Sequence, residues 1–356
     1  MDNQFSFVKN PKIPKNIVIE SIKYKHRFWK NFWKKKTNKF LIISLIIFLL
    51  LIVCLSIFNP FSATKPVLNS ELVQDLPPYY APIITKTFDK SPFTDYLFYL
   101  DRTSSFHIIN YINYQSNFII TYNPYELLRQ INPDFHAYFL LGTNFNGVDN
   151  LAIFSYSFLI SIIIVVLSSF IQLILGSYAG VFLGFYFQRN IPKFSYWLIS
   201  IIVTIPFLLI NIIIFNLIGY SFLKAILVLS LVGFFPIFYA SYGQTSQLVT
   251  LDYVNAYKIT GLSTLKIMHK ILKEILLANL PLLSEQITLG FLSLASLSFF
   301  NIAEITTQIN IGNLYKQIID NQNNWPLFTL TLISSIGFVA TTKLLSFNLA
   351  KWYILR

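Results

Sequence analysis

The sequence predicts an all-α polytopic membrane protein with six transmembrane helices. Of its 356 residues, 54% are apolar and only 12% are charged, about half the charged fraction of an ordinary soluble domain. Six sustained apolar runs are each long enough to cross a hydrocarbon core of roughly 30 Å. They cover about residues 40–58, 153–187, 194–218, 222–242, 275–299 and 327–348. This composition excludes a soluble enzyme, because so few charges cannot cover a water-exposed surface.

The run at residues 40–58 predicts an uncleaved membrane anchor. The 39 residues before it carry eleven Lys or Arg against two acidic residues, which accounts for nine of the twelve net positive charges. Because the run begins far from Met1, it is not expected to be a cleaved signal peptide. Lys and Arg beside a span stay in the cytoplasm, so residues 1–39 are expected to form a cytoplasmic basic segment.

Aromatic side chains are mixed with the lysines of this segment, namely Phe28, Trp29, Phe32 and Trp33. Aromatic rings and cations together suit the lipid headgroup layer. A membrane-surface segment is therefore favoured over an arm that binds nucleic acid, and we expect membrane lipid but no nucleic acid as a partner.

The charges on the loops fit an amino terminus inside the cell. Residues 59–149, placed outside, hold five Lys or Arg and eight Asp or Glu. The segments placed inside, at 188–193, 243–274 and 350–356, have an excess of Lys and Arg. Since basic residues near span ends set orientation, both termini are expected to be cytoplasmic.

The outer segment 59–150 is expected to contain a small subdomain. It holds several prolines and then two stretches of alternating apolar and polar residues, 106–114 and 118–122. Alternation with a period of two predicts short β-strands.

The run at 153–187 predicts one long or tilted helix with a packing face. It contains no polar break that would divide it into a hairpin. Gly176, Gly180 and Gly184 lie four residues apart on one face, where small residues let another backbone approach closely. The partner of this face is either a helix of the same bundle or a second membrane subunit.

The sequence offers no candidate catalytic residue and no candidate metal site. It lacks the G-x-x-x-x-G-K-[ST] pattern that cradles nucleotide phosphates. Its four histidines are scattered, and its single cysteine, Cys54, lies in an apolar run. Any ATP is therefore expected to be hydrolysed by another chain.

Two further features bear on a transport pathway. Glu285 is the main candidate for a charge within the membrane, although its place about ten residues into its run favours an interfacial position. Pro206, Pro236 and Pro281 fall inside or at the ends of spans. Such kinks either surround a pathway or only serve packing.

The loop 243–274 is the most informative segment. Asp252 is expected to cap a short helix that runs to about Thr260, and Gly261 to end it in the left-handed conformation. This helix is expected to project into the cytoplasm and to dock into a groove of a partner protein. The residues expected on its surface are Tyr253, Val254, Ala256 and Tyr257.

A second helix is expected to follow, capped by Ser263 and running into the fifth span. Its apolar and basic residues separate onto two faces, as in a helix at the inner headgroup layer. The residues expected on its apolar face are Leu265, Met268, Leu272 and Ile275.

The loop resembles the cytoplasmic motif of bacterial ABC importer permeases, in which Glu-Ala-Ala is followed by three residues and Gly. Asn255, Ala256 and Tyr257 stand at the first three positions here, and Gly261 stands at the last. A second motif is similar to the signature of oligopeptide and dipeptide permease C-type subunits. It comprises His136, the run Leu141-Gly142-Thr143-Asn144-Phe145-Asn146-Gly147-Val148-Asp149, and Ser161.

This resemblance implies a type I ABC importer permease core over residues 151–349, with a coupling loop at 243–274. The coupling helix and its turn would contain Asp252, Tyr253, Asn255, Ala256, Tyr257 and Gly261. The implied partners are a second homologous permease subunit, two ATP-binding subunits that hold ATP and Mg²⁺, and an extracellular substrate-binding protein, usually a lipoprotein. The chain itself would be no enzyme, would hold no cofactor and would lie in a bacterial plasma membrane.

The substrate and the driving force stay open between several functions. The resemblance favours oligopeptides or dipeptides, and related permeases also import nickel complexes or other small solutes. An ion-coupled secondary carrier or channel is the alternative from another class, and it would depend on Glu285. A membrane scaffold without transport is the third hypothesis.

Overall fold

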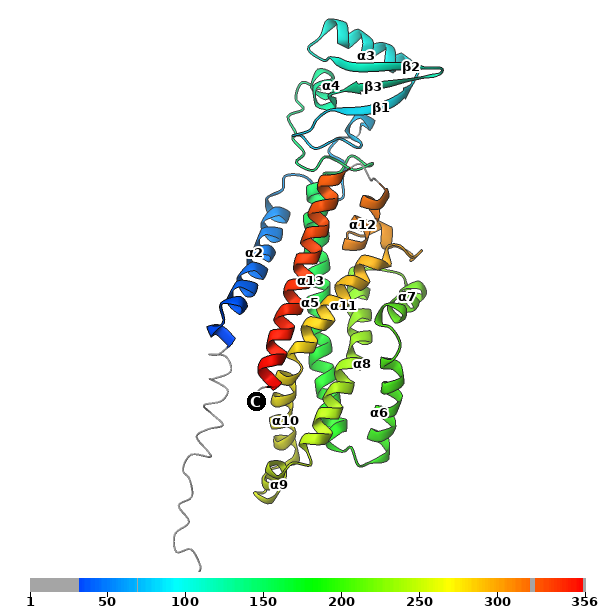
Figure 1. Ribbon diagram of the computed structural model, residues 1–356. Coiled ribbons are helices and arrows are strands. Elements are labelled where there is room, and N and C mark those ends of the chain that lie inside the picture. Colours follow the sequence, from blue (N-terminus) through cyan, green and yellow to red (C-terminus); the bar gives the residue numbers. More distant parts are fainter. Residues whose placement is uncertain (1–31, 69, 321–323, 355–356) are drawn as a thin grey trace, which may run out of the picture.

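The computed structural model describes residues 32–68, 70–320 and 324–354, with backbone alone for 351–354. A long helical bundle carries a small domain with a β-sheet at one end and a short projecting helix, α9, at the other (Figure 1). We call these the sheet end and the α9 end. Most of the predicted basic segment, residues 1–31, lies outside the described residues, as do residues 355 and 356 of the tail.

The bundle consists of helices which, except for those at residues 264–278 and 311–320, follow the predicted apolar runs. They are α2 (Lys36–Phe58), α5 (Asn150–Phe185), α6 (Asn190–Val203), α7 (Phe207–Ile218), α8 (Phe222–Leu248), α10 (Thr264–Ala278), α11 (Leu280–Leu297), α12 (Ile311–Asp320) and α13 (Trp325–Ile354). Among the described residues, five helices are long and apolar enough to cross a membrane, and a sixth span exists if α6 and α7 count together. The multi-pass membrane fold predicted from the sequence is confirmed.

The predicted run at 194–218 is not one continuous helix. α6 and α7 are separate helices that meet at an angle of 90°. Pro206 stands at the break, where it has no N–H to donate to the preceding turn and caps the start of α7. Hydropathy did not reveal the break because the residues around it, such as Ile205, are themselves apolar.

The predicted span at 275–299 also begins too early. Residues 275–278 belong to α10, and α11 starts only at Leu280. Pro281 lies in the first turn of α11, where its missing N–H costs no hydrogen bond within α11. α10 packs its apolar face against α5 and α8; its predicted position at the headgroups stays a prediction. The loop predicted to begin at residue 243 likewise starts later, because α8 continues to Leu248.

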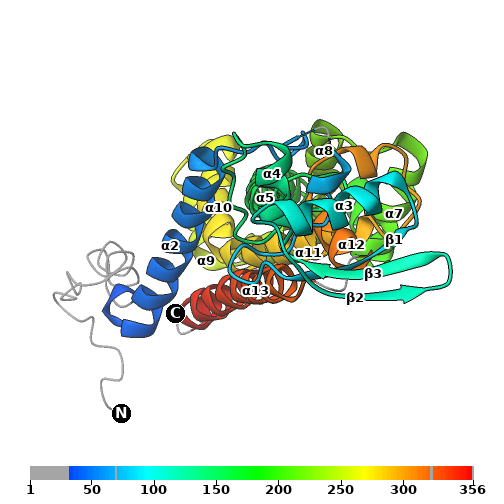
Figure 2. The same ribbon diagram turned by 90° about the horizontal axis from the view of Figure 1, so that it is seen from above.

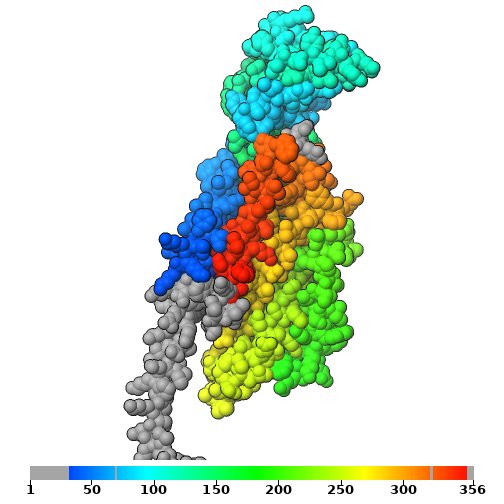
Figure 3. Space-filling model, in the orientation of Figure 1, coloured from blue at the N-terminus to red at the C-terminus, as the bar shows by residue number. Residues whose placement is uncertain are grey.

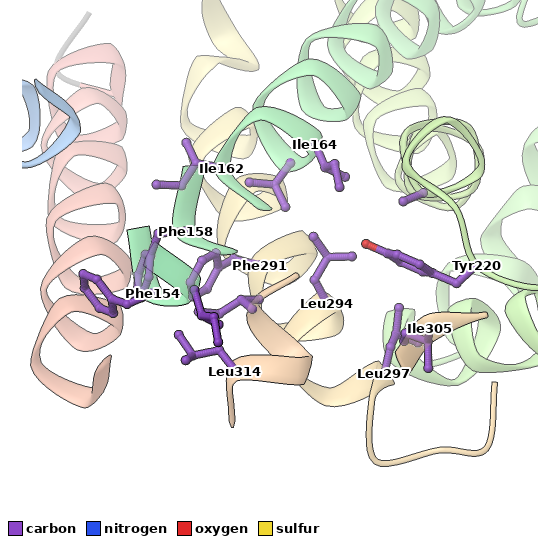
Figure 4. Packing of buried hydrophobic residues seen from close by; sticks show 14 of the residues in the cluster. Phe154, Phe158, Ile162, Ile164, Tyr220, Phe291, Leu294, Leu297, Ile305 and Leu314 are labelled. Atoms are coloured by element: carbon purple, nitrogen blue, oxygen red, sulfur yellow. The ribbon is translucent and has the colours of Figure 1, made fainter. Parts of the chain in front are cut away.

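The core of the bundle lies between α5, α8 and α11. α5 is one helix of 36 residues, about 54 Å long, which confirms the prediction of a single long helix. Phe154 and Phe158 of α5 belong to one buried apolar cluster with Phe291 of α11 and Leu314 of α12 (Figure 4). The rings of Phe158 and Phe291 lie 5.9 Å apart. This apolar packing fixes α11 and α12 against α5.

The sheet end is a small α+β domain, of which the sequence predicted the strands but not the helices. Strands β1 (Ile84–Asp89), β3 (Asn117–Tyr122) and β2 (Ile108–Tyr114) form an antiparallel sheet in the order β1-β3-β2. The two predicted alternating stretches are thus confirmed as β2 and β3. Helix α3 (Pro92–Thr103) packs its Phe98 against Tyr111 and Phe118 of the sheet. The hairpin β2–β3 extends beyond the helices when the bundle is viewed from above (Figure 2).

Two short helical elements and one longer turn connect the sheet to the bundle. They are η1 (Glu71–Val73), α4 (Pro124–Ile131) and the segment 139–149. In the bundle, the short helix η2 (Ile305–Thr307) precedes α12. Tyr125 of α4 is buried, and its hydroxyl donates to the carbonyl of Pro77 at 2.8 Å.

Candidate functional site

Helix α9 (Asp252–Ile259) follows α8 and precedes α10 in the chain, and it projects from the lower end of the bundle (Figure 1). Only Val254 is buried on it, against Val249 at the end of α8 and Ile267 and Ile271 of α10. The prediction that Val254 is exposed is therefore wrong. Leu251, in extended conformation, occupies the N-cap position, so Asp252 is the first helical residue and not the cap. Its carboxylate still lies at the positive end of the helix dipole.

The turn after α9 is formed as predicted. Gly261 has a φ angle of +74°, which L-residues other than Gly rarely adopt. The N–H of Gly261 donates to the carbonyl of Lys258, and the N–H of Leu262 donates to that of Tyr257. A Cβ atom at Gly261 would meet nothing within 4 Å. The surface beside this turn is therefore open.

Two large apolar side chains flank this turn and were missed as site residues. Ile259 is 87% exposed and Leu265, in the first turn of α10, is 77% exposed. The sequence placed Leu265 on the buried face, but that face consists of Ile267, Ile271 and Ile275 with Met268 and Leu272. Figure 3 shows the tip formed by α9 and α10 protruding from the lower end of the molecule.

Aromatic contacts fix α9 to α10. The ring of Tyr257 lies 3.9 Å from Nζ of Lys270, and the hydroxyl of Tyr253 donates to Glu274 at 3.2 Å. Asn255 and Ala256, the other predicted coupling residues, are exposed. These two contacts join α9 to α10.

The junction between α10 and α11 is polar and buried. Asn279 is fully buried, and its side-chain N–H groups donate to Ser241 of α8 at 2.7 Å and to Ser177 of α5 at 3.2 Å. Asn279 thereby joins α5 and α8 to the junction of α10 and α11. The sequence carries one signal for this junction, an Asn directly before Leu280-Pro281.

The three predicted packing glycines lie against α8 of the same chain. A Cβ atom at Gly180 would lie 2.5 Å from Cβ of Ser241 and 2.8 Å from the carbonyl oxygen of Phe238. Gly176 and Gly184 are in similarly close contact with Ile237 and Thr245. Of the two partners left open by the sequence, the structure places a helix of the same bundle at this seam.

The signature run at 141–149 forms a compact turn at the sheet end. Gly142 and Gly147 have φ angles of +70° and +71°, and Thr143 accepts a hydrogen bond from the N–H of Leu76 at 2.9 Å. Asp149 caps α5 through the N–H of Ala152 and also accepts from Asn59 at 2.9 Å. Burial raises the pKa of Asp149, against the effect of these hydrogen bonds.

The remaining signature residues do not gather at one place. His136 is exposed. Ser161 is buried in α5, and its hydroxyl accepts the N–H of Ile311 at 2.9 Å, which caps α12. Val148 of the signature run is buried in the core of the bundle. The signature therefore positions the sheet end, α5 and α12 relative to one another.

An apolar hollow of 520 Å³ lies where α6 and α7 bend. Thr204 and Pro206 line it at the bend, Pro236 lines it from α8, and Ser293 and Ser296 line it from α11. The hydroxyl of Ser293 is buried without a hydrogen-bond partner in the described structure. Two of the three predicted proline kinks thus border one cavity, whereas Pro281 lies apart and accepts a hydrogen bond from Ser346.

Glu285 does not stand alone. Its carboxylate lies 3.4 Å from Nζ of Lys343 of α13, and both side chains are about half exposed. An exposed ion pair of this kind contributes little to stability.

The comparisons with known proteins decide the family. Residues 173–351, half of the chain, match the model of the binding-protein-dependent transport system inner membrane component. The chain belongs to this family. The match includes the glycine seam of this permease (Gly176, Gly180 and Gly184), α9, the residues that line the hollow, and most of α13. A relative is the oligopeptide transport system permease protein AmiD of Streptococcus pneumoniae, 28% identical over 224 residues, which are 61% of this chain and 71% of AmiD.

This membership gives the class of function. The permease is a membrane-embedded transport subunit of an ABC importer, and subunits of this kind are not enzymes themselves. It works with ATPase and substrate-binding partners in general. The resemblance to oligopeptide and dipeptide permease subunits is confirmed.

Proposed function

We propose that this permease forms half of the translocation pathway of an ATP-driven importer of oligopeptides or dipeptides. The substrate class is supported by the similarity to AmiD and by the signature run at 141–149. In this proposal the other half comes from a second homologous permease, and an extracellular lipoprotein delivers the peptide. Two ATP-binding subunits hold ATP and Mg²⁺, and this chain holds no cofactor.

The observation that carries the coupling role is the uncovered tip of α9. Ile259 is a large apolar side chain that is almost fully exposed on a projecting helix, and such a side chain suits an apolar groove on a partner. In the proposed orientation both chain termini and α9 face the cytoplasm, where the ATPase subunits lie. Asp252, Asn255 and Ala256 complete the docking surface.

The contacts of α9 suggest how movement spreads. Tyr253 and Tyr257 join α9 to α10, and α10 ends at Asn279, which is bonded to α5 and α8. When the ATPase subunits close, α9 and α10 move together and shift Asn279 against the glycine seam. α11 follows, and because Ser293 and Ser296 of α11 line the hollow, the hollow changes shape.

Gly261 provides the test of this function. Nothing lies within 4 Å of the Cβ position of Gly261, so a Trp ring has room there. Gly261→Trp should insert and block the docking surface, with some strain in the turn because its φ of +74° is unfavourable for any L side chain. The assembled importer, reconstituted into liposomes with its binding protein, should lose ATP-driven uptake of a labelled peptide by at least about tenfold. Gly261→Ala is the matched control, because Ala brings the same left-handed backbone strain without the bulk.

Uptake by Gly261→Trp at the rate of the unmodified importer would refute the coupling role. If the unmodified importer moves another small solute but no peptide, the substrate is wrong while the coupling role stands.

A further inference from the structure

A polar cavity of 340 Å³ opens at the α9 end, apart from the hollow at the α6–α7 bend. Three segments line it: the turn that follows α5, the end of α8, and the side of α9 that carries Asn255 and Lys258. The turn contributes residues 185–189, and α8 contributes Val249 and Thr250. We call this cavity the basic pocket.

Two cations converge on the basic pocket. The guanidinium of Arg189 lies over the ring of Tyr186 at 4.8 Å, and Nζ of Lys258 lies over the ring of Phe185 at 5.9 Å. Both rings line the same cavity. These contacts restrict the two cations to the rim of the pocket.

Neither cation is neutralised within the described part of the chain. No carboxylate lines the pocket, and neither Arg189 nor Lys258 forms an ion pair there. Two like charges around one cavity repel each other, and an anion between them removes this repulsion. The amides of Gln188 and Asn255 also line the pocket and can donate hydrogen bonds.

We propose that the basic pocket binds a phosphate group, supplied by the headgroup of an anionic phospholipid. A phosphate diester accepts paired hydrogen bonds from a guanidinium and is attracted by the point charge of an ammonium. Arg189 supplies the guanidinium and Lys258 the ammonium. The pocket should therefore bind anionic lipid more tightly than zwitterionic lipid, because Arg189 and Lys258 repel the cationic group of a zwitterionic headgroup.

The position of the pocket favours a lipid over a soluble anion. It lies where the long apolar helices α5 and α8 end, and Phe185, Tyr186 and Phe187 stand at this end. Aromatic rings at the end of a spanning helix mark the headgroup layer, where basic residues meet anionic lipid. The acyl chains then lie along the exposed apolar side chains of α5, such as Phe182. This inference requires the membrane location of the permease but not its peptide substrate.

Retention of lipid by the purified full-length permease tests the proposal. The protein is taken in detergent from vesicles of phosphatidylcholine with phosphatidylglycerol, and bound lipid is counted by native mass spectrometry. Arg189→Gln and Lys258→Gln should each weaken retention of phosphatidylglycerol roughly fivefold, whereas Arg189→Lys should retain most of it. Lys266→Gln, which removes an exposed cation of α10 outside the pocket, is the control and should have no effect.

Three results would overturn the proposal. One is equal retention of phosphatidylglycerol by all variants with unchanged thermal denaturation. Another is binding of inorganic phosphate to the lipid-free protein that displaces phosphatidylglycerol at millimolar concentration, which would assign the pocket to a soluble anion. The third is that Arg189→Gln and Lys258→Gln leave lipid retention unchanged but weaken binding of the ATPase subunits. That result would assign the basic pocket to an acidic side chain of the ATPase subunits.

Discussion

Replacing Ile259 with aspartate should detach the permease from its ATPase subunits without unfolding it. Ile259 is 87% exposed on α9 and contributes almost nothing to the core of the chain. If it is buried in a partner's groove, its apolar surface stabilises the complex by about 1.5–3 kcal/mol. A carboxylate in that groove adds a desolvation cost. We therefore expect the dissociation constant of the complex to rise by more than about tenfold, and peptide uptake to fall with it.

Co-purification of the ATPase subunits with the tagged permease measures this effect, with thermal denaturation as the check on folding. Ile83→Asp removes a similar exposed isoleucine, 60% exposed, from the sheet end, and should leave the complex intact. Ile259→Val should behave like the unmodified protein. Normal association of the Ile259→Asp variant would show that α9 is not the contact.

Replacing Gly180 with alanine should separate α5 from α8. The added Cβ would lie 2.5 Å from Ser241 and 2.8 Å from the backbone of α8 at Phe238. Because a backbone carbonyl cannot turn aside as a flexible side chain can, the two helices must move apart. We expect a loss of about 3 kcal/mol, the upper part of the range for overpacking. The hydrogen bond from Asn279 to Ser241 should weaken as well.

Thermal denaturation of the purified protein in detergent measures the loss. Gly337→Ala in α13 is the matched control, since its Cβ would meet nothing within 4 Å and alanine favours the helix by up to about 1 kcal/mol. Equal stability of the two variants would contradict the close approach of α5 and α8. A loss for Gly180→Ala alone supports it.

The sequence predicted those parts of the fold that depend on long, uniform patterns. The unbroken apolar run at 153–187 predicted α5, and alternation over 106–114 and 118–122 predicted strands at the places of β2 and β3. Both succeed because many residues contribute to one periodicity. The left-handed turn at Gly261 succeeded for a different reason, since a single residue type strongly favours that backbone conformation.

Predictions failed where one residue or a tertiary contact decides the structure. The bend at Pro206 lies within an apolar run, so hydropathy gave no boundary, and the angle of 90° depends on how α7 packs. The break at Asn279 depends on hydrogen bonds to Ser177 and Ser241, far apart in the sequence.

The face of α9 was the least predictable feature of the candidate site. Eight residues contain too few turns to define an apolar face. Val254 is buried and Ile259 exposed only because α10 folds back on one side. The glycine seam was predicted from spacing, but its partner α8 was not, because small residues show only that some backbone comes close.

The location of α9 relative to the membrane tests the account most directly. In a Cys54→Ser background, Thr260→Cys places one thiol beside the docking surface, and Thr87→Cys places one on the exposed side of β1 in the domain at the sheet end. In intact cells a membrane-impermeant maleimide should label Thr87→Cys and should reach Thr260→Cys only after the membrane is permeabilised. Labelling of Thr260→Cys in intact cells would place α9 outside, where no ATPase subunit can bind it.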